Sequence, residues 1–137
     1  MRVSRRRAVW RHATLIAAAV ALALGTLSPL AFAADSGFGP LKGRWLRPDG
    51  GYILDIRNVR ADGAIDAVYL NPRPINIGSA KALRDGSTLR LSVELRAPNY
   101  PGSTYTLTYD PKRDELSGVY FQAVQGQSFE VVFVRTK

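Results

Sequence analysis

The chain has 137 residues, with 19 basic and 11 acidic side chains and a formal net charge of +8. Its length is that of a single domain. It contains no cysteine, which excludes disulfide bonds and cysteine-based zinc sites, and His12 is its only histidine.

The first 33 residues have the three parts of a secretory signal peptide. A basic start is followed by an uncharged apolar run over residues 13–24 and then by the helix breakers Gly25 and Pro29. Small residues, Ala31 and Ala33, stand at the −3 and −1 positions, so we expect cleavage after Ala33. An uncleaved anchor is the alternative, because residues 13–34 carry no charge and about 20 apolar residues can cross a bilayer.

The basic start also bears on the export route. Ser4-Arg5-Arg6-Arg7-Ala8 is similar to the twin-arginine motif, although Ala8 stands where that motif usually has Phe. We therefore expect the Sec route in preference to the Tat route. The processed protein is expected to be periplasmic or secreted. Without cysteine it cannot carry a lipoprotein anchor, and we expect no stable membrane anchor after cleavage.

Removing the leader changes the chemistry of the chain. Five of the arginines lie in it, so the remainder has 14 basic and 11 acidic residues and a net charge of +3, which removes the main argument for nucleic-acid binding. His12 and the only methionine, Met1, are lost as well. Ser-His-Asp and Cys-His catalysis then cannot be assembled. We expect a protein that is not an enzyme and has no cofactor, no metal and no nucleic-acid partner.

Beyond a short arm at 34–40, short alternating segments predict an all-β domain over 41–137. We expect the arm to be a frayed terminus; an inserting element is the alternative. In Leu89–Leu95 every second residue is apolar. Turns rich in Gly, Pro, Asn and Asp separate the segments. Eight strands are predicted, at 42–46, 51–59, 64–70, 76–84, 87–95, 103–110, 115–122 and 128–135. Eight sequential antiparallel strands close most simply into an up-and-down barrel.

The lengths of the connections predict two different ends for this barrel. Successive turns lie at alternate ends, and the second, fourth and sixth connections are mostly tight, as at Asp62-Gly63 and Asp85-Gly86. The other end includes the longer segments at 71–75 and 96–102. We therefore expect one narrow end and one wide end, and a ligand would enter at the wide end.

Short motifs resemble the calycin barrels of lipocalins and avidins. Gly43-Arg44-Trp45 resembles their opening Gly-x-Trp, Arg135 resembles the late arginine that packs across that ring, and Leu116–Tyr120 is similar to avidin-like Leu-x-Gly-x-Tyr strands. The resemblance implies a structural role for Trp45 and Arg135. It does not imply biotin binding, because the aromatic cage of avidins needs several tryptophans and Trp45 is the only one after the leader.

The apolar phase of the strands identifies candidate site residues. It places mostly large side chains inside: Ile65, Ala67, Tyr69, Leu89, Leu91, Val93, Leu95, Tyr105, Leu107, Tyr109, Leu116, Tyr120, Phe129, Val131 and Phe133. Buried phenols need hydrogen-bond partners. The inward tyrosines either satisfy one another and Gln122, or line a shallow pocket at the wide end. Polar side chains are expected around that end: Arg47, Asn71, Arg73, Arg96, Asn99, Tyr100, Gln125 and Gln127.

Two functions remain open at this level. The first is the binding of a small anionic or hydroxylated ligand at the open end, since arginine binds carboxylate and phosphate well. Its candidate residues are Tyr69, Arg73, Arg96, Tyr100, Tyr105, Tyr120 and Gln122. The alternative is a protein–protein module, such as an inhibitor of an envelope or secreted enzyme. Small calycin-like inhibitors share this barrel, but the usual bacterial type carries a disulfide that is missing here.

Overall fold

A computed structural model describes residues 37–137 of the chain. The predicted signal peptide over residues 1–33, its cleavage residues Ala31 and Ala33, and residues 34–36 of the arm lie outside the described residues. In the described part, no helix is long and apolar enough to cross a membrane.

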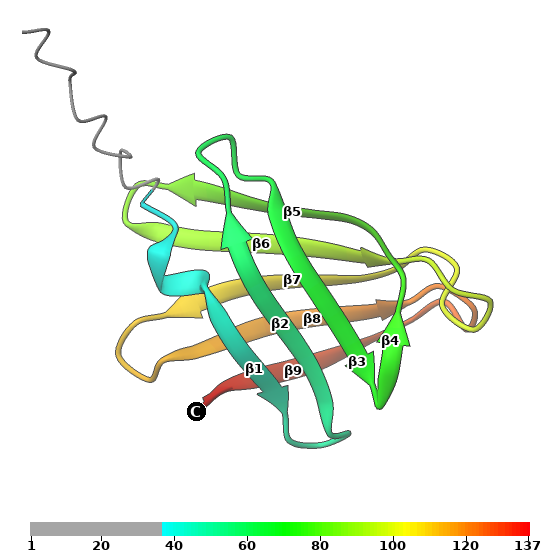
Figure 1. Cartoon of the computed structure of the whole chain (residues 1–137). Coiled ribbons are helices and arrows are strands. Elements are labelled where there is room, and N and C mark those ends of the chain that lie inside the picture. Colours follow the sequence, from blue (N-terminus) through cyan, green and yellow to red (C-terminus); the bar gives the residue numbers. More distant parts are fainter. Residues whose placement is uncertain (1–36) are drawn as a thin grey trace, which may run out of the picture. The chain divides into compact units, whose positions relative to one another are not determined.

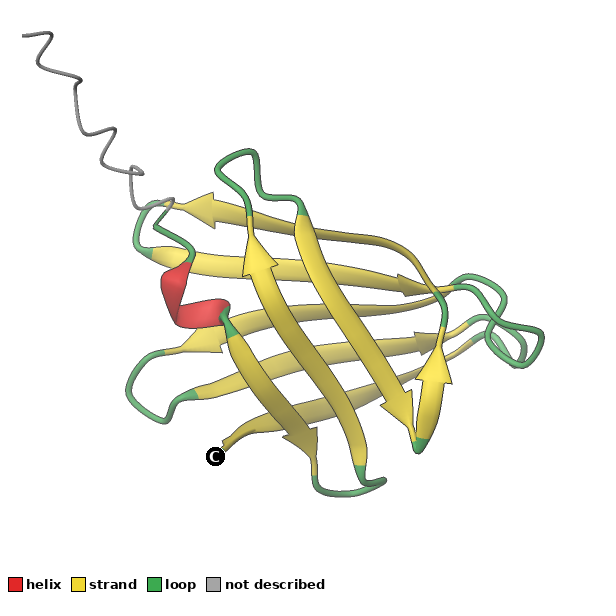
Figure 2. Ribbon diagram, in the orientation of Figure 1, coloured by secondary structure: helices red, strands yellow, loops and turns green. Residues whose placement is uncertain are grey.

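Nine antiparallel strands form one sheet in the described part of the chain (Figures 1 and 2). They follow one another along the chain as β1 (Gly43–Arg47), β2 (Tyr52–Val59), β3 (Ile65–Asn71), β4 (Arg73–Ile75), β5 (Ile77–Asp85), β6 (Thr88–Leu95), β7 (Ser103–Asp110), β8 (Glu115–Gln122) and β9 (Gln127–Thr136). Their order in the sheet is β4-β3-β2-β1-β9-β8-β7-β6-β5. The first and last long strands are therefore neighbours, and the sheet curls into a barrel.

The barrel is nearly closed at the seam between β3 and β5. Just before β3, Ala64 forms an isolated antiparallel bridge with Lys81 of β5. The amide of Ala82 donates a hydrogen bond to the carbonyl of Gly63, with an N–O distance of 2.7 Å. Further along, β3 pairs with the short strand β4 instead. The seam is thus bonded at the narrow end only.

The prediction of eight strands was wrong by one, because the segment expected as a loop at 71–75 contains β4. There Pro74 lies opposite Leu70 of β3. A proline has no amide hydrogen to donate, which is why the segment was interpreted as a connection, but an edge strand tolerates this loss. The predicted strand at 76–84 is confirmed as β5, which runs one residue later, from Ile77 to Asp85.

The alternating pattern correctly identified the core. Leu89, Leu91, Val93 and Leu95 of β6 are all buried, and so are the inward residues of β7 to β9 except at their ends. Ile65 and Ala67 are only partly buried and pack against the core. Phe129 faces inward as predicted and stacks on Tyr120, yet 43% of this side chain is exposed. It stands at the start of β9 at the wide end, where the barrel has no further layer to cover it.

A short segment plugs the narrow end. Phe38 and Leu41 are buried, the latter in the 3-10 helix η1 (Gly39–Leu41), so the expectation of a frayed terminus was wrong for residues 37–41. The indole nitrogen of the fully buried Trp45 donates to the carbonyl of Leu41, at 2.9 Å. The guanidinium carbon of Arg135 lies 4.1 Å from the centroid of the Trp45 ring. The expected packing of Arg135 across Trp45 is confirmed.

Arg135 also connects the turn between β7 and β8 to the segment that precedes β1. It binds both carboxylate oxygens of Asp114, at 2.6 and 2.9 Å, and donates to the carbonyls of Pro40 and Lys42. The hydrogen bonds from Arg135 lower the pKa of Asp114 below its ordinary value, against a smaller opposing effect of burial. The hydroxyl of Tyr109 donates to the same carboxylate, at 3.1 Å.

The Asp114–Arg135 pair predicts an acid-dependent loss of stability. Because the folded-state pKa of Asp114 is lowered, its contribution is complete above the unfolded pKa of about 4 and is lost as the pH falls through the folded value. We expect the free energy of unfolding to fall less steeply below pH ~4 in Asp114→Asn than in the native chain. The carboxylate is partly exposed, so the difference at neutral pH should be ~1 kcal/mol or less.

Urea unfolding at a series of pH values measures this difference. Asparagine suits the test because it tolerates the positive φ of 53° at this position. Asp85→Asn is the control, since this exposed carboxylate has no ion pair within residues 37–137. Parallel pH profiles for the native chain and Asp114→Asn would contradict the prediction.

Candidate ligand-binding site

A cavity of about 290 Å³ opens at the wide end of the barrel. Its walls come from the last residues of β1, β3 and β8, the first residues of β2, β7 and β9, and two loops: Arg47, Tyr52, Tyr69, Tyr100, Tyr105, Tyr120, Gln122, Gln125 and Phe129. Six of these residues are aromatic. The volume is at the lower limit of small-molecule pockets, which begin at about 300 Å³.

Arg47 is the only basic residue in this wall, and it lies inside the barrel with 11% of its side chain exposed. Its Nε and Nη2 groups donate to the two carboxylate oxygens of Asp49, at 2.7 and 2.8 Å. The guanidinium carbon lies 5.0 Å from the ring centroid of Tyr52 and 5.6 Å from that of Tyr120. Such cation–π contacts stabilise a charge that has lost part of its water.

The electrostatics of the cavity follow from these contacts. Burial acts to lower the pKa of Arg47, but the hydrogen bonds with Asp49 and Tyr105 outweigh it and raise that pKa. The hydrogen bonds from Arg47 lower the pKa of Asp49. Both groups therefore stay ionised, and the positive charge at the cavity is balanced by a carboxylate of the same turn.

Two phenols form a short hydrogen-bonded chain with Arg47. The Nη1 group of Arg47 donates to the hydroxyl of Tyr105 at 3.1 Å, and the hydroxyls of Tyr105 and Tyr69 lie 2.7 Å apart. Burial raises the pKa of both phenols, so both are protonated at neutral pH. One of their two protons serves the mutual bond, whichever phenol donates it. The other proton has no acceptor among the described residues, and both phenols border the cavity.

Gln122 has a hydrogen-bond acceptor without a donor. Its carbonyl oxygen Oε1 is buried, yet it has no hydrogen-bond partner in the described part of the chain. A buried acceptor without a partner costs free energy of about 1–3 kcal/mol. Tyr100, another lining residue, accepts a hydrogen bond from the side-chain amide of Asn71. Because Gln122 lines the cavity, a turn of its side-chain amide would present this unused acceptor to a bound group.

Most of the predicted site residues meet at this cavity. Tyr69, Tyr100, Tyr105, Tyr120 and Gln122 all line it. Both interpretations of the inward tyrosines hold in part, because Tyr69 and Tyr105 satisfy each other and still border a cavity.

The structure does not bring Arg73 and Arg96 to the cavity wall. Arg73 is exposed on the edge strand β4. Arg96 is 66% exposed and pairs with Glu94, its Nε lying 2.8 Å from the carboxylate. Both side chains are exposed to water, which solvates the guanidinium charge.

Sequence reasoning did not assign Tyr52 to the site, and it placed Arg47 on the rim. The signal for both was the alternation of β1 and β2. Arg47 shares the phase of Trp45, and Tyr52 shares the phase of the buried Leu54. The charge of Arg47 led to its interpretation as a solvated residue, whereas in the structure Asp49 and two aromatic rings make its burial possible.

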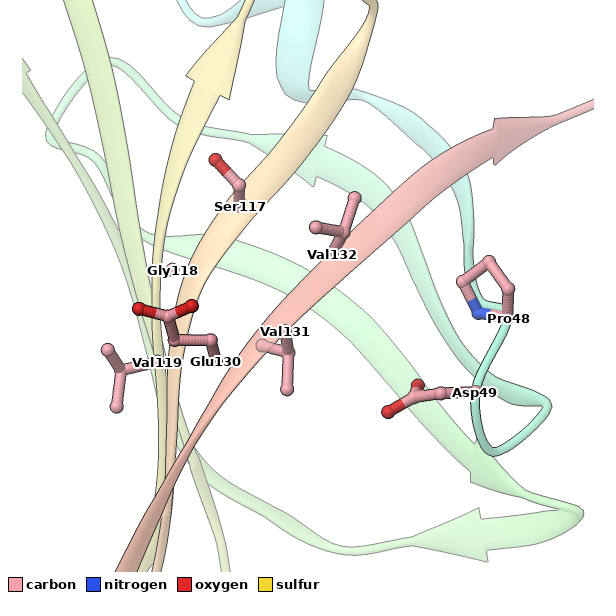
Figure 3. A pocket seen from close by; sticks show the side chains of 8 residues that line it. All are labelled: Pro48, Asp49, Ser117, Gly118, Val119, Glu130, Val131 and Val132. Atoms are coloured by element: carbon pink, nitrogen blue, oxygen red, sulfur yellow. The ribbon is translucent and has the colours of Figure 1, made fainter.

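A second hollow lies on the outer surface of β8 and β9, beside the turn that follows β1 (Figure 3). Its volume is about 660 Å³, and it is lined by Pro48, Asp49, Ser117, Gly118, Val119, Glu130, Val131 and Val132. Val119, Phe121 and Val132, which we call the outer apolar strip, are each 41–42% exposed on these two strands. The hollow is an open groove without an unpartnered buried polar atom among its lining residues, so the smaller cavity is the better ligand site.

The described residues thus form a nearly closed antiparallel β-barrel that is compatible with a calycin-like fold. No protein-family model, curated protein or solved structure matches the chain. Within residues 37–137, no group of three or more His, Asp or Glu side chains lies close enough to hold a metal ion.

Proposed function

We propose that the protein is an exported, non-enzymatic barrel that binds a small ligand in the cavity at its wide end. The observation that carries this proposal is the cavity of about 290 Å³, one of whose lining residues, Gln122, has a buried side-chain oxygen without a partner among the described residues. A polar atom left without a partner in an otherwise satisfied barrel calls for a group that completes it, and a polar group of a bound ligand can do so.

Binding is a better account of this cavity than catalysis. Among the described residues no carboxylate, serine or threonine lines it, and burial raises the pKa of Tyr69 and Tyr105, so these two phenols stay protonated. General acid–base work needs a group whose pKa is near the operating pH. Arg47 is bound by Asp49 and Tyr105, so its position is fixed before any ligand arrives. The export proposal rests on the leader sequence over residues 1–33.

Native mass spectrometry of the protein taken from the exporting cell tests the proposal. We expect a small-molecule adduct on the native protein, and its loss in Gln122→Trp, which places a ring in the cavity. Gln127→Trp is the matched control, because Gln127 is the cross-strand neighbour of Gln122 but is exposed and outside the cavity wall. An adduct that is absent, or equally present in both variants, would contradict binding at this site.

The second candidate function is a protein–protein module, and the outer apolar strip favours it. Exposed apolar patches commonly mark interaction surfaces. The fitting occupant is a protein of the same exported compartment, such as a secreted enzyme, whose apolar surface covers Val119, Phe121 and Val132. The same mass spectra separate the two functions. A bound protein that is lost in Val119→Asp but retained in Gln122→Trp would favour the module.

A further inference from the structure

Resting on the proposed function, we infer that the cavity selects an uncharged, flat ring compound with one or two hydroxyl groups, of the phenol class. Three properties of the wall lead to this ligand: its balanced charge, its pair of unused hydrogen-bonding groups and its aromatic faces. Each property excludes a different competing class of small molecule.

Charge excludes simple anions. Arg47 is the only cation in the cavity wall, and its Nε and Nη2 groups already bind both oxygens of Asp49. An incoming carboxylate would lose its water and then share one guanidinium with a carboxylate already in place. A buried charge without a full partner is costly. An uncharged ligand loses far less water and meets no repulsion.

The hydrogen-bonding groups of the cavity residues favour a ligand that has a hydroxyl group. The buried Oε1 of Gln122 lacks a donor among the described residues, and a turn of this amide toward the cavity would let a ligand supply one. The spare proton of the Tyr69–Tyr105 pair needs an acceptor. A hydroxyl group both donates and accepts, so a single hydroxyl can satisfy either wall group, and two can satisfy both. An ether or a hydrocarbon would leave the oxygen of Gln122 unpaired.

The remaining wall is aromatic and calls for a flat ring. The rings of Tyr105 and Tyr120 are stacked with centroids 4.6 Å apart, and the ring of Phe129 continues the stack beyond Tyr120. Phe129 ends this stack and is 43% exposed, so its ring is open to pair with a further aromatic ring. A sugar would also stack, but it would bring several further hydroxyls into a cavity that has few polar groups left to receive them, and each unpaired hydroxyl would weaken binding.

An NMR titration of the purified protein tests this inference with four probes: phenol, anisole, benzoate and glucose. Phenol and anisole share a ring, but anisole has no hydroxyl to donate. We expect phenol to shift the amide signals of Tyr105 and Gln122 and to bind at least about tenfold more tightly than anisole or benzoate, because a site built for a hydroxyl rejects analogues that lack it.

Two variants and a control attribute this preference to Gln122. Gln122→Leu and Gln122→Met, both of which remove the amide, should bring phenol and anisole to within about twofold of each other. Gln127→Leu makes the same change on the neighbouring strand outside the cavity wall and should preserve the preference. Tighter binding of benzoate or glucose at the same residues would overturn the phenol class and leave the proposed function standing. If no probe shifts the cavity residues, the inference fails, and an adduct in the native mass spectrum still decides the proposed function.

Discussion

Replacing Trp45 with alanine is expected to unfold the barrel at ordinary temperature. Truncating a buried tryptophan to alanine costs about 3–5 kcal/mol, and the whole free energy of unfolding of a domain is about 5–15 kcal/mol. No disulfide adds to the stability of this domain, because the chain contains no cysteine. The loss of this single side chain is therefore comparable with the total stability.

The expected effect is large because Trp45 holds together three parts of the narrow end. Its ring is fully buried and meets the edge of Tyr109, with centroids 6.1 Å apart. Its indole nitrogen binds the carbonyl of Leu41, and Arg135 covers its face. Alanine would leave a cavity beneath η1 and would remove the surface against which Arg135 is packed, so the plug formed by η1 would lose its attachment as well.

Circular dichroism during heating measures the effect, and Trp45→Phe is the matched control. Phenylalanine keeps a ring in the core but loses the hydrogen bond to Leu41 and part of the contact with Arg135, so we expect a folded protein with a lower melting temperature. A cooperative thermal unfolding transition of Trp45→Ala within a few degrees of the native one would show that the barrel does not depend on Trp45 for its stability.

The strands were predictable because their information is local. In β6 the apolar residues from Leu89 to Leu95 alternate with polar ones, and a one-residue shift would expose the whole set. Short turns with Gly and Asp then require neighbours to pair. The same argument predicted which strand ends form the wide end, and so it brought Tyr69, Tyr105 and Tyr120 to one place.

What could not be predicted depends on contacts between distant residues or on compensation of a charge. The short strand β4 exists because residues 73–75 fold back on β3, a pairing that no alternation in a Pro-rich segment reveals. The inward position of Arg47 depends on Asp49 and on rings from β2 and β8. Likewise the unpaired oxygen of Gln122 is a property of the packed site. The cavity residues were largely predictable, whereas the chemistry of the cavity was not.

The substitution Gly63→Ala is expected to open the seam of the barrel and to lower the free energy of unfolding by about 2–5 kcal/mol. Gly63 has a φ of +85°, in the region that residues with a Cβ atom avoid. It also lies against β5, and an added Cβ would overlap with the carbonyl oxygen of Ala82, a backbone atom that cannot rotate away.

This position matters because few bonds close the barrel. The amide of Ala82 donates to the carbonyl of Gly63, and the bridge between Ala64 and Lys81 follows directly. Beyond these contacts β3 pairs with β4 and not with β5. A methyl group that pushes residue 63 away from Ala82 would therefore break the closure at its only bonded point in the described sheet, and the edges of β3 and β5 would be exposed to water.

Gly86→Ala is the control that separates the two contributions to this loss of stability, the overlap with Ala82 at the seam and the cost of a positive φ. Gly86 also has a positive φ, of 59°, but an added Cβ there meets no atom within 4 Å. This substitution should cost only the ~1–2 kcal/mol of the left-handed conformation.

Urea unfolding of both variants gives the difference between their free energies of unfolding, and hydrogen exchange at the amide of Ala82 reports the opening of the seam directly. Exchange at Ala82 should accelerate in Gly63→Ala beyond the change in global stability and should follow global stability in Gly86→Ala. Equal destabilisation by the two substitutions would mean that the barrel does not depend on its closure between β3 and β5.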